Sequence, residues 1–202
     1  FTCGVEGSHD LTVADKTAQS LGLKLAARVV ARDEVPQMAL SAASSLFFFD
    51  KMQLGIGLPL FGACQEASKK GFRVVFSGQG SDEVFCGYSY YLKALQENGF
   101  PGVEKEIVSS LGRMWHRDLF RDDALSMASS VELRLPFLDT GFLKSALAVP
   151  ASEKIKSATD SLRKHPVRKI GEKLGLSEEI VLRPKKAMQY GSGFASALEK
   201  LF

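Results

Sequence analysis

The sequence predicts an α/β protein in which a parallel sheet flanked by helices is followed by a mostly helical C-terminal part. Three observations support this class. Residues 72–76, FRVVF, are apolar on both faces, as in a parallel strand that helices cover on each side. A glycine-rich turn at 77–83 and an apolar-periodic helix follow directly, which is the usual order in α/β domains. Beyond Asn98 the patterns are mostly helical.

The elements before the turn are predicted from short apolar runs and from the residues that begin and end them. The N-terminal strand is apolar and ends near Gly7, and the first helix opens at Asp10 and stops at Gly22. A later helix carries Lys69 and Lys70 in its last turn, where cations favour the helix dipole. In chain order we expect a strand at 1–5, helices at 10–22, 33–49 and 58–70, and a strand at 72–76.

The elements after the turn are helices. One helix is expected to run to about Leu95, and the sequence Asn98-Gly-Phe-Pro predicts a break. Residues 103–130 and 160–182 have helical patterns, and no second run of strands is evident. We therefore expect one domain over 1–202, with an α/β nucleotide-binding part at 1–100 and a helical part at 101–202.

Composition and charge exclude several classes of protein. A chain of 202 residues with 45% hydrophobic residues is ordinary for a globular protein, which excludes disorder and a coiled-coil rod. The net charge of +3 is too small to imply nucleic acid or a membrane as a partner. The three cysteines are widely spaced, so we expect reduced, buried thiols in a cytoplasmic protein. The apolar runs are too short for a transmembrane helix.

The turn Ser77-Gly78-Gln79-Gly80-Ser81-Asp82-Glu83 is the main candidate site. Its glycines allow a sharp bend with exposed N–H groups, and Ser81 is a candidate N-cap of the next helix. These groups suit a phosphate, and a Mg²⁺ ion would reconcile phosphate with the two carboxylates. Alternatively, Asp82 and Glu83 only complement a helix dipole.

Four segments in the same order resemble the synthetase domain of the asparagine synthetase family. SGQGSDEVFCGY resembles the family signature SGEGSDE-[VL]-F-G-G-Y, and FTCGVEGSHDLTVADKTAQSLG resembles its second strand and helix. RDDALSMASSVELRLPFLD is similar to its S-M-A-x-S-x-E-x-R-x-P-F-L-D segment. KHPVRKIGEKLG through RPKKAMQYGSG is similar to its terminal K-x-x-[LV]-R…R-x-K segment. The segments cover most of the chain.

This resemblance implies an adenine nucleotide alpha hydrolase-like, Rossmann-like fold and an ATP-dependent amide-forming ligase. Members of the family activate the β-carboxylate of aspartate with Mg²⁺ and ATP, release pyrophosphate, and form asparagine when ammonia attacks β-aspartyl-adenylate. The implied partners are aspartate and ammonia, or glutamine through a separate or fused glutaminase. A homodimer is left open.

The resemblance also implies roles for individual residues. Ser77 and Gly78, with Gly80 and Ser81, would contact the nucleotide, and Asp82 would bind Mg²⁺. Cys3 and Gly4 would lie beside the adenine. Gln79 and Lys185 occupy catalytic positions, with Lys185 neutralising the phosphates. The alternative for Lys185 and Lys186 is a solvated basic turn, and for Glu132, Arg134 and Asp139 we favour a buried ion pair over direct catalysis.

Two departures from the family pattern stand out. Gln79 replaces the glutamate of SGEGSDE, and an amide is no base at neutral pH. The family's S-G-G-x-D-S pyrophosphate loop and its glutaminase domain are not found in the sequence, so we expect a domain truncated at its N-terminus. Three hypotheses follow: an asparagine synthetase-like ligase, a degenerate non-catalytic binder of nucleotide or partner protein, and a β-lactam synthetase-like ligase acting on another carboxylate.

Overall fold

The chain forms two compact units, each assembled from separate stretches of sequence. The computed structural model describes residues 1–47, 50–184 and 187–199. Unit 1 comprises Phe1–Val75, His116–Leu133 and Lys186–Phe202, and unit 2 comprises Phe76–Trp115 and Arg134–Lys185. Each unit has hydrophobic core residues of its own. The expectation of one domain over 1–202, with an α/β part at 1–100 and a helical part at 101–202, stays a prediction.

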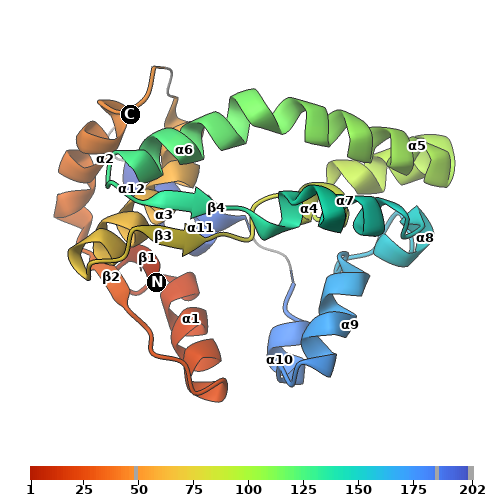
Figure 1. Cartoon of the computed structure of the whole chain (residues 1–202), viewed down its shortest axis with the longest axis horizontal. Coiled ribbons are helices and arrows are strands. Elements are labelled where there is room, and N and C mark those ends of the chain that lie inside the picture. Colours follow the sequence, from red (N-terminus) through yellow and green to blue (C-terminus); the bar gives the residue numbers. More distant parts are fainter. Residues whose placement is uncertain (48–49, 185–186, 200–202) are drawn as a thin grey trace. The chain divides into compact units, whose positions relative to one another are not determined.

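A parallel strand pair begins unit 1. Strands β1 (Thr2–Val5) and β2 (Ala27–Val30) pair in parallel, with Cys3 opposite Arg28, and helix α1 (His9–Ser20) lies in the connection between them (Figure 1). A parallel pair needs such a crossover because the chain must return to the same end of the sheet. The predicted α/β class with parallel strands is confirmed.

Helix α3 (Lys51–Lys69) is the centre of unit 1. Asp50 caps it, because one carboxylate oxygen accepts a hydrogen bond from the Gln53 amide at 2.7 Å. The helix packs against β1, and at Gly62 the contact is close enough that a Cβ would lie 2.2 Å from Cys3 Sγ. The remaining elements of unit 1 are η1 (Arg32–Glu34), α2 (Val35–Ala43), α6 (Phe120–Met127), α11 (Met188–Gly191) and α12 (Phe194–Leu198).

Unit 2 is mostly helical. Its long helix α5 (Tyr90–Met114) is kinked at Gly99, where φ is 66°, so the break expected after Asn98 is confirmed. Phe85 makes edge contacts with two other aromatic rings in the core. The other helices are α4 (Ser81–Val84), η3 (Pro136–Leu138), α7 (Thr140–Leu147), α8 (Ala151–Lys154), α9 (His165–Lys173) and α10 (Glu178–Val181).

A second two-stranded sheet lies where the chain passes between the units. It consists of β3 (Val74–Phe76) and β4 (Glu132–Arg134). The Glu132 amide donates to the Arg73 carbonyl at 2.8 Å, and the Ser77 amide donates to the Arg134 carbonyl at 2.9 Å. A π-helical turn, η2 (Trp115–Leu119), connects α5 to α6.

Several sequence predictions are wrong in detail. The strand expected at 72–76 is shorter, and Val74 and Phe76 are 43% and 77% exposed, so helices do not cover both of its faces. The helix expected from residue 58 begins at Lys51, and the helix expected at 33–49 ends at Ala43. Strands β2 and β4 were not predicted, because runs of four and three residues carry too little periodicity.

The thiol prediction is confirmed. Cys3, Cys64 and Cys86 are free and buried. Burial raises the pKa of Cys3 and Cys86 to about 12 and that of Cys64 to about 11, so all three stay protonated at neutral pH. Over residues 1–47, 50–184 and 187–199 no helix is long and apolar enough to cross a membrane. The same residues contain no group of three or more His, Cys, Asp or Glu that could hold a metal.

Candidate functional site

The loop at residues 77–83 lies in unit 2 and consists of the turn at 77–80, which follows β3, and the first three residues of α4. Gly80 is its sharpest point: it has φ 91°, and a Cβ there would lie 2.4 Å from a Leu138 methyl carbon. Both its conformation and the space therefore require glycine. Gly78 differs, because a Cβ there would have no atom within 4 Å. The crest of the loop at Gly78 is thus open, whereas its base at Gly80 is closely packed.

The loop holds its hydroxyl and amide groups in defined contacts. The backbone amide of Gln79 donates to Ser77 Oγ at 3.3 Å, and both residues are half-buried. Gly80, rather than Ser81, is the N-cap of α4, so the predicted capping role of Ser81 is wrong. Ser81 is the first helical residue, and its hydroxyl faces a side chain from a distant part of unit 2.

That side chain is Lys164. Its ammonium donates to Ser81 Oγ at 2.8 Å and lies 3.3 Å from an Asp82 carboxylate oxygen. The side chains of Lys164 and Asp82 are 17% and 20% exposed, so the ion pair is mostly shielded from water. Such pairs interact more strongly than pairs on an open surface. Lys164 is the first residue of the segment that is similar to K-x-x-[LV]-R, but no role was predicted for it from the sequence.

Glu83 lies next to Asp82 but is engaged differently. It is 2% exposed, and its carboxylate accepts a hydrogen bond from the Tyr88 hydroxyl at 2.8 Å. Its backbone carbonyl accepts another from the Tyr91 hydroxyl at 2.7 Å, and burial raises the pKa of Tyr91 so that this donor stays protonated. Glu83 therefore anchors α4 to α5, and of the two predicted carboxylates Asp82 is the more accessible to a ligand.

Glu132 and Arg134, which lie in β4, and Asp139, which follows that strand, were expected to form a buried ion pair. Glu132, Arg134 and Asp139 are all exposed, so that prediction is wrong. Asp139 instead caps α7, because its carboxylate accepts a hydrogen bond from the Phe142 amide at 3.0 Å. Pro136 opens the η3 turn just before it.

Two further predicted site residues, Cys3 and Gly4, belong to unit 1. The Cys3 side chain is 4% exposed and packs on Gly62 of α3, so it contributes to the core. Gly4 is buried as well, so the structure exposes neither residue to a ligand, and their binding role stays a prediction. Lys185 lies outside the described residues.

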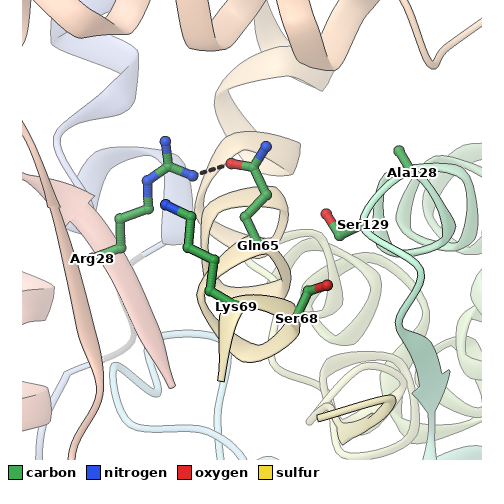
Figure 2. A pocket seen from close by; sticks show the side chains of 6 residues that line it. All are labelled: Arg28, Gln65, Ser68, Lys69, Ala128 and Ser129. Atoms are coloured by element: carbon green, nitrogen blue, oxygen red, sulfur yellow. Dashed lines mark hydrogen bonds between the residues drawn. The ribbon is translucent and has the colours of Figure 1, made fainter. Parts of the chain in front are cut away.

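Unit 1 also contains a polar hollow of about 320 Å³ (Figure 2). Figure 2 shows the Arg28 guanidinium reaching from β2 to the Gln65 amide of α3, with which it forms a hydrogen bond. Lys69 lies next to Arg28 in this view, and the hollow is also lined by Ser68 of α3 and by Ser129, which follows α6. Among the described residues that line the hollow, the charged groups are the Arg28 guanidinium and the Lys69 ammonium.

Comparison with known proteins adds a family match. The family model described as asparagine synthase matches residues 1–104 and 99–201. A Methanocaldococcus jannaschii protein named as a candidate glutamine-hydrolysing asparagine synthetase is 32% identical over 229 residues, spanning 100% of this chain and 42% of the relative. The glutamine-hydrolysing asparagine synthetase of Gallus gallus is 31% identical over 100% of this chain and 35% of its own length. The human asparagine synthetase domain-containing protein 1 is 37% identical over 64% of this chain and 20% of its own. The chain thus spans less than half the length of these relatives.

Proposed function

Since the chain belongs to the asparagine synthase family, we propose that it forms the ATP-dependent, amide-forming part of a ligase that makes asparagine. Asparagine synthase domains have the adenine nucleotide alpha hydrolase fold, which agrees with the α/β architecture and the parallel β1–β2 pair. One observation carries the proposal: the contact of Lys164 with Ser81 and Asp82, next to the open loop crest at Gly78.

The proposed reaction has two steps. A β-carboxylate oxygen of aspartate attacks the α-phosphorus of ATP, and the bond to pyrophosphate breaks, which leaves an acyl-adenylate. Ammonia then attacks the acyl carbon and loses a proton, and AMP leaves with the electron pair of the broken C–O bond. Negative charge builds on phosphate oxygens in the first step and on the acyl oxygen in the second. Fixed donors and cations at these positions therefore accelerate the reaction.

The loop at 77–83 supplies such groups. By resemblance to the family we assign nucleotide contacts to Ser77, Gly78, Gly80 and Ser81. Of these, Gly78 has open space beside it, where a phosphate could approach the backbone. The Lys164 ammonium would neutralise phosphate charge from the side of Ser81. Lys185 is proposed to do the same during pyrophosphate release, by resemblance alone.

The donor set at the loop fits Mg²⁺. Asp82 provides a partly shielded carboxylate, and Mg²⁺ is usually bound through one or two carboxylates together with the substrate's phosphates. When bound, the ion would polarise phosphate oxygens. Asp82 would hold it, while Lys164 would balance the charge of the same carboxylate.

Gln79 favours a second candidate function. Its side-chain amide can orient a nucleophile by hydrogen bonding but cannot accept a proton from it at neutral pH. The chain would then be a non-catalytic binder of nucleotide, or a ligase for another carboxylate that obtains its base elsewhere. The source of ammonia, free or released from glutamine by a glutaminase, belongs to the same proposal.

Aspartate-dependent ATP–pyrophosphate exchange tests the proposal. We expect exchange in the intact protein and a loss of about 100-fold or more in Asp82→Asn and in Lys164→Met. Lys93→Met is the matched control, because Lys93 is 74% exposed and its ion pair is with Glu97, one turn along α5. Absence of exchange with aspartate and with other carboxylates would disprove the ligase. Asparagine formation that is present only in Gln79→Glu would favour a degenerate binder.

A further inference from the structure

The turn that carries Lys164 has an unusual backbone. Arg163 and Lys164 both have φ 52°, so two consecutive residues other than glycine lie in the left-handed region. A side chain makes this region less populated by roughly tenfold for each residue. Strain of this kind persists only where the surroundings impose the conformation, and it gathers at functional sites.

Asp160 imposes the conformation from one side of the turn. One of its carboxylate oxygens accepts hydrogen bonds from the Leu162 amide at 3.1 Å and the Arg163 amide at 3.0 Å. The other accepts from the Lys156 amide at 2.9 Å and contacts His165 Nε2 at 2.7 Å. The Asp160 side chain is 7% exposed, so water competes little for these bonds.

Arg168 imposes it from the other side. Its guanidinium donates to the carbonyls of Arg163 at 2.7 Å and Leu162 at 2.5 Å, and it also donates to the Arg183 carbonyl at 3.0 Å. The amides of the turn are thus bound by a carboxylate, and its carbonyls by a guanidinium. Both groups act on the same two or three peptide units and therefore stabilise this conformation of the turn.

This conformation places the Lys164 ammonium. Lys164 is the N-cap residue of α9, and from there its side chain reaches Ser81 and Asp82, more than eighty residues earlier in the chain. We infer that Asp160 is a positioning residue, which holds the turn at 160–164 so that the Lys164 ammonium meets the nucleotide loop. The role of this placement in nucleotide binding rests on the proposed function, but the placement of Lys164 itself can be measured without any ligand.

Acetylation kinetics measure the placement. We would treat the intact protein with an acetylating reagent and follow each lysine by mass spectrometry, with the exposed Lys93 as the internal reference. In the wild type, Lys164 should react slowly, because it is mostly buried and ion-paired. In Asp160→Ala the Lys164 rate relative to Lys93 should rise about tenfold, since the turn loses the carboxylate that binds its amides. An unchanged rate in a folded variant would overturn the inference.

A second substitution separates positioning from general stability. Glycine adopts the left-handed region without a side-chain penalty, so Arg163→Gly in the Asp160→Ala background should restore most of the protection of Lys164. If Asp160→Ala does not fold by circular dichroism, Asp160→Asn replaces it. Asn keeps an acceptor oxygen for the amides but loses the charge, and it should give a smaller rise. A rise without rescue by Arg163→Gly would mean that Asp160 acts through something other than this backbone.

Measurements of nucleotide binding then test whether the position of the Lys164 ammonium contributes to ATP affinity. By calorimetry with Mg²⁺ and ATP, Asp160→Ala and Lys164→Met should each weaken binding about tenfold, and the double variant should be no weaker than Lys164→Met alone. If the losses of ATP affinity in the two single variants add up in the double variant, Asp160 does not act on ATP binding through Lys164. If the wild type binds no ATP, the proposed function fails, while the acetylation result still decides whether Asp160 positions Lys164.

Discussion

The centre of unit 1 and the loop of unit 2 are stabilised by different interactions. Helix α3 is fixed by apolar side chains and by close packing at Gly62, where it meets Cys3. The loop at 77–83 is held by charged and hydroxyl groups, including Lys164 on Ser81 and Asp82. The first arrangement follows from a local apolar pattern, whereas the second depends on residues far apart in the sequence. Substitutions in α3 should therefore affect folding, and those at the crest of the loop should affect ligands.

The largest effect is expected at Gly62. In Gly62→Ala the new methyl group would lie 2.2 Å from Cys3 Sγ and 3.0 Å from Cys3 Cβ, so strand β1 must move away from α3. We expect a loss of about 3 kcal/mol in the free energy of unfolding, measured by urea denaturation. Adding Cys3→Ala removes the sulfur and should recover part of the loss.

Gly112→Ala is the matched control for that substitution. Gly112 lies in α5, is exposed, and a Cβ there would have no atom within 4 Å. Alanine should therefore be neutral or stabilise the protein by about 0.5 kcal/mol. Equal effects at Gly62 and Gly112 would contradict the packing argument.

The next largest effect separates the two glycines of the loop. Gly80→Ala combines a φ of 91° with a contact of 2.4 Å to Leu138, and it should cost about 2 kcal/mol of stability. Gly78→Ala meets no atom within 4 Å and should leave the urea midpoint unchanged. It should nevertheless weaken binding of ATP, because the methyl group enters the space offered to the ligand. A Gly78→Ala variant that binds ATP normally would contradict a nucleotide at this crest.

The same contrast explains what could be predicted from the sequence. The class, the break near Gly99 and the loop at 77–83 carry local signals: apolar runs, glycine and proline, and a dense motif. Strand β2 was missed because ARVV is only four residues long and has no clear alternation. Strand β3 was expected to be buried because its residues are apolar, yet Phe76 is 77% exposed.

The contacts of the candidate site were harder to predict than its position. Nothing in the sequence near Lys164 indicates that its ammonium meets Ser81, because the contact depends on how α9 and the turn before it fold against α4. The local sequence does not show which of the two carboxylates, Asp82 or Glu83, is accessible to a ligand. Only the tertiary structure shows that tyrosines engage Glu83 and that Asp82 faces a lysine.

A smaller effect is expected at Tyr88. Tyr88→Phe removes the hydroxyl that donates to the buried Glu83 carboxylate and should cost about 1.5 kcal/mol, the low end for a hydrogen bond to a charged group. Urea denaturation gives the value. Tyr190→Phe is the control, because Tyr190 is 63% exposed and should change stability by less than about 0.5 kcal/mol. Similar losses in the two variants would mean that Glu83 does not need the Tyr88 donor.

The smallest effect is the acid sensitivity conferred by Asp160. Burial opposes ionisation of this carboxyl, but the amides of Arg163 and Lys156 and the His165 ring outweigh it and lower the pKa to about 2. A carboxyl with a lowered pKa stabilises the fold above its unfolded value of about 4, and this contribution is lost as the pH falls from about 4 to about 2. We expect about 1 kcal/mol, taken as the difference in urea stability between pH 5 and pH 2.5 in the wild type minus that in Asp160→Asn. Equal pH dependence in the two proteins would show that the carboxylate charge does not hold the turn. The amide contacts alone would then have to place Lys164.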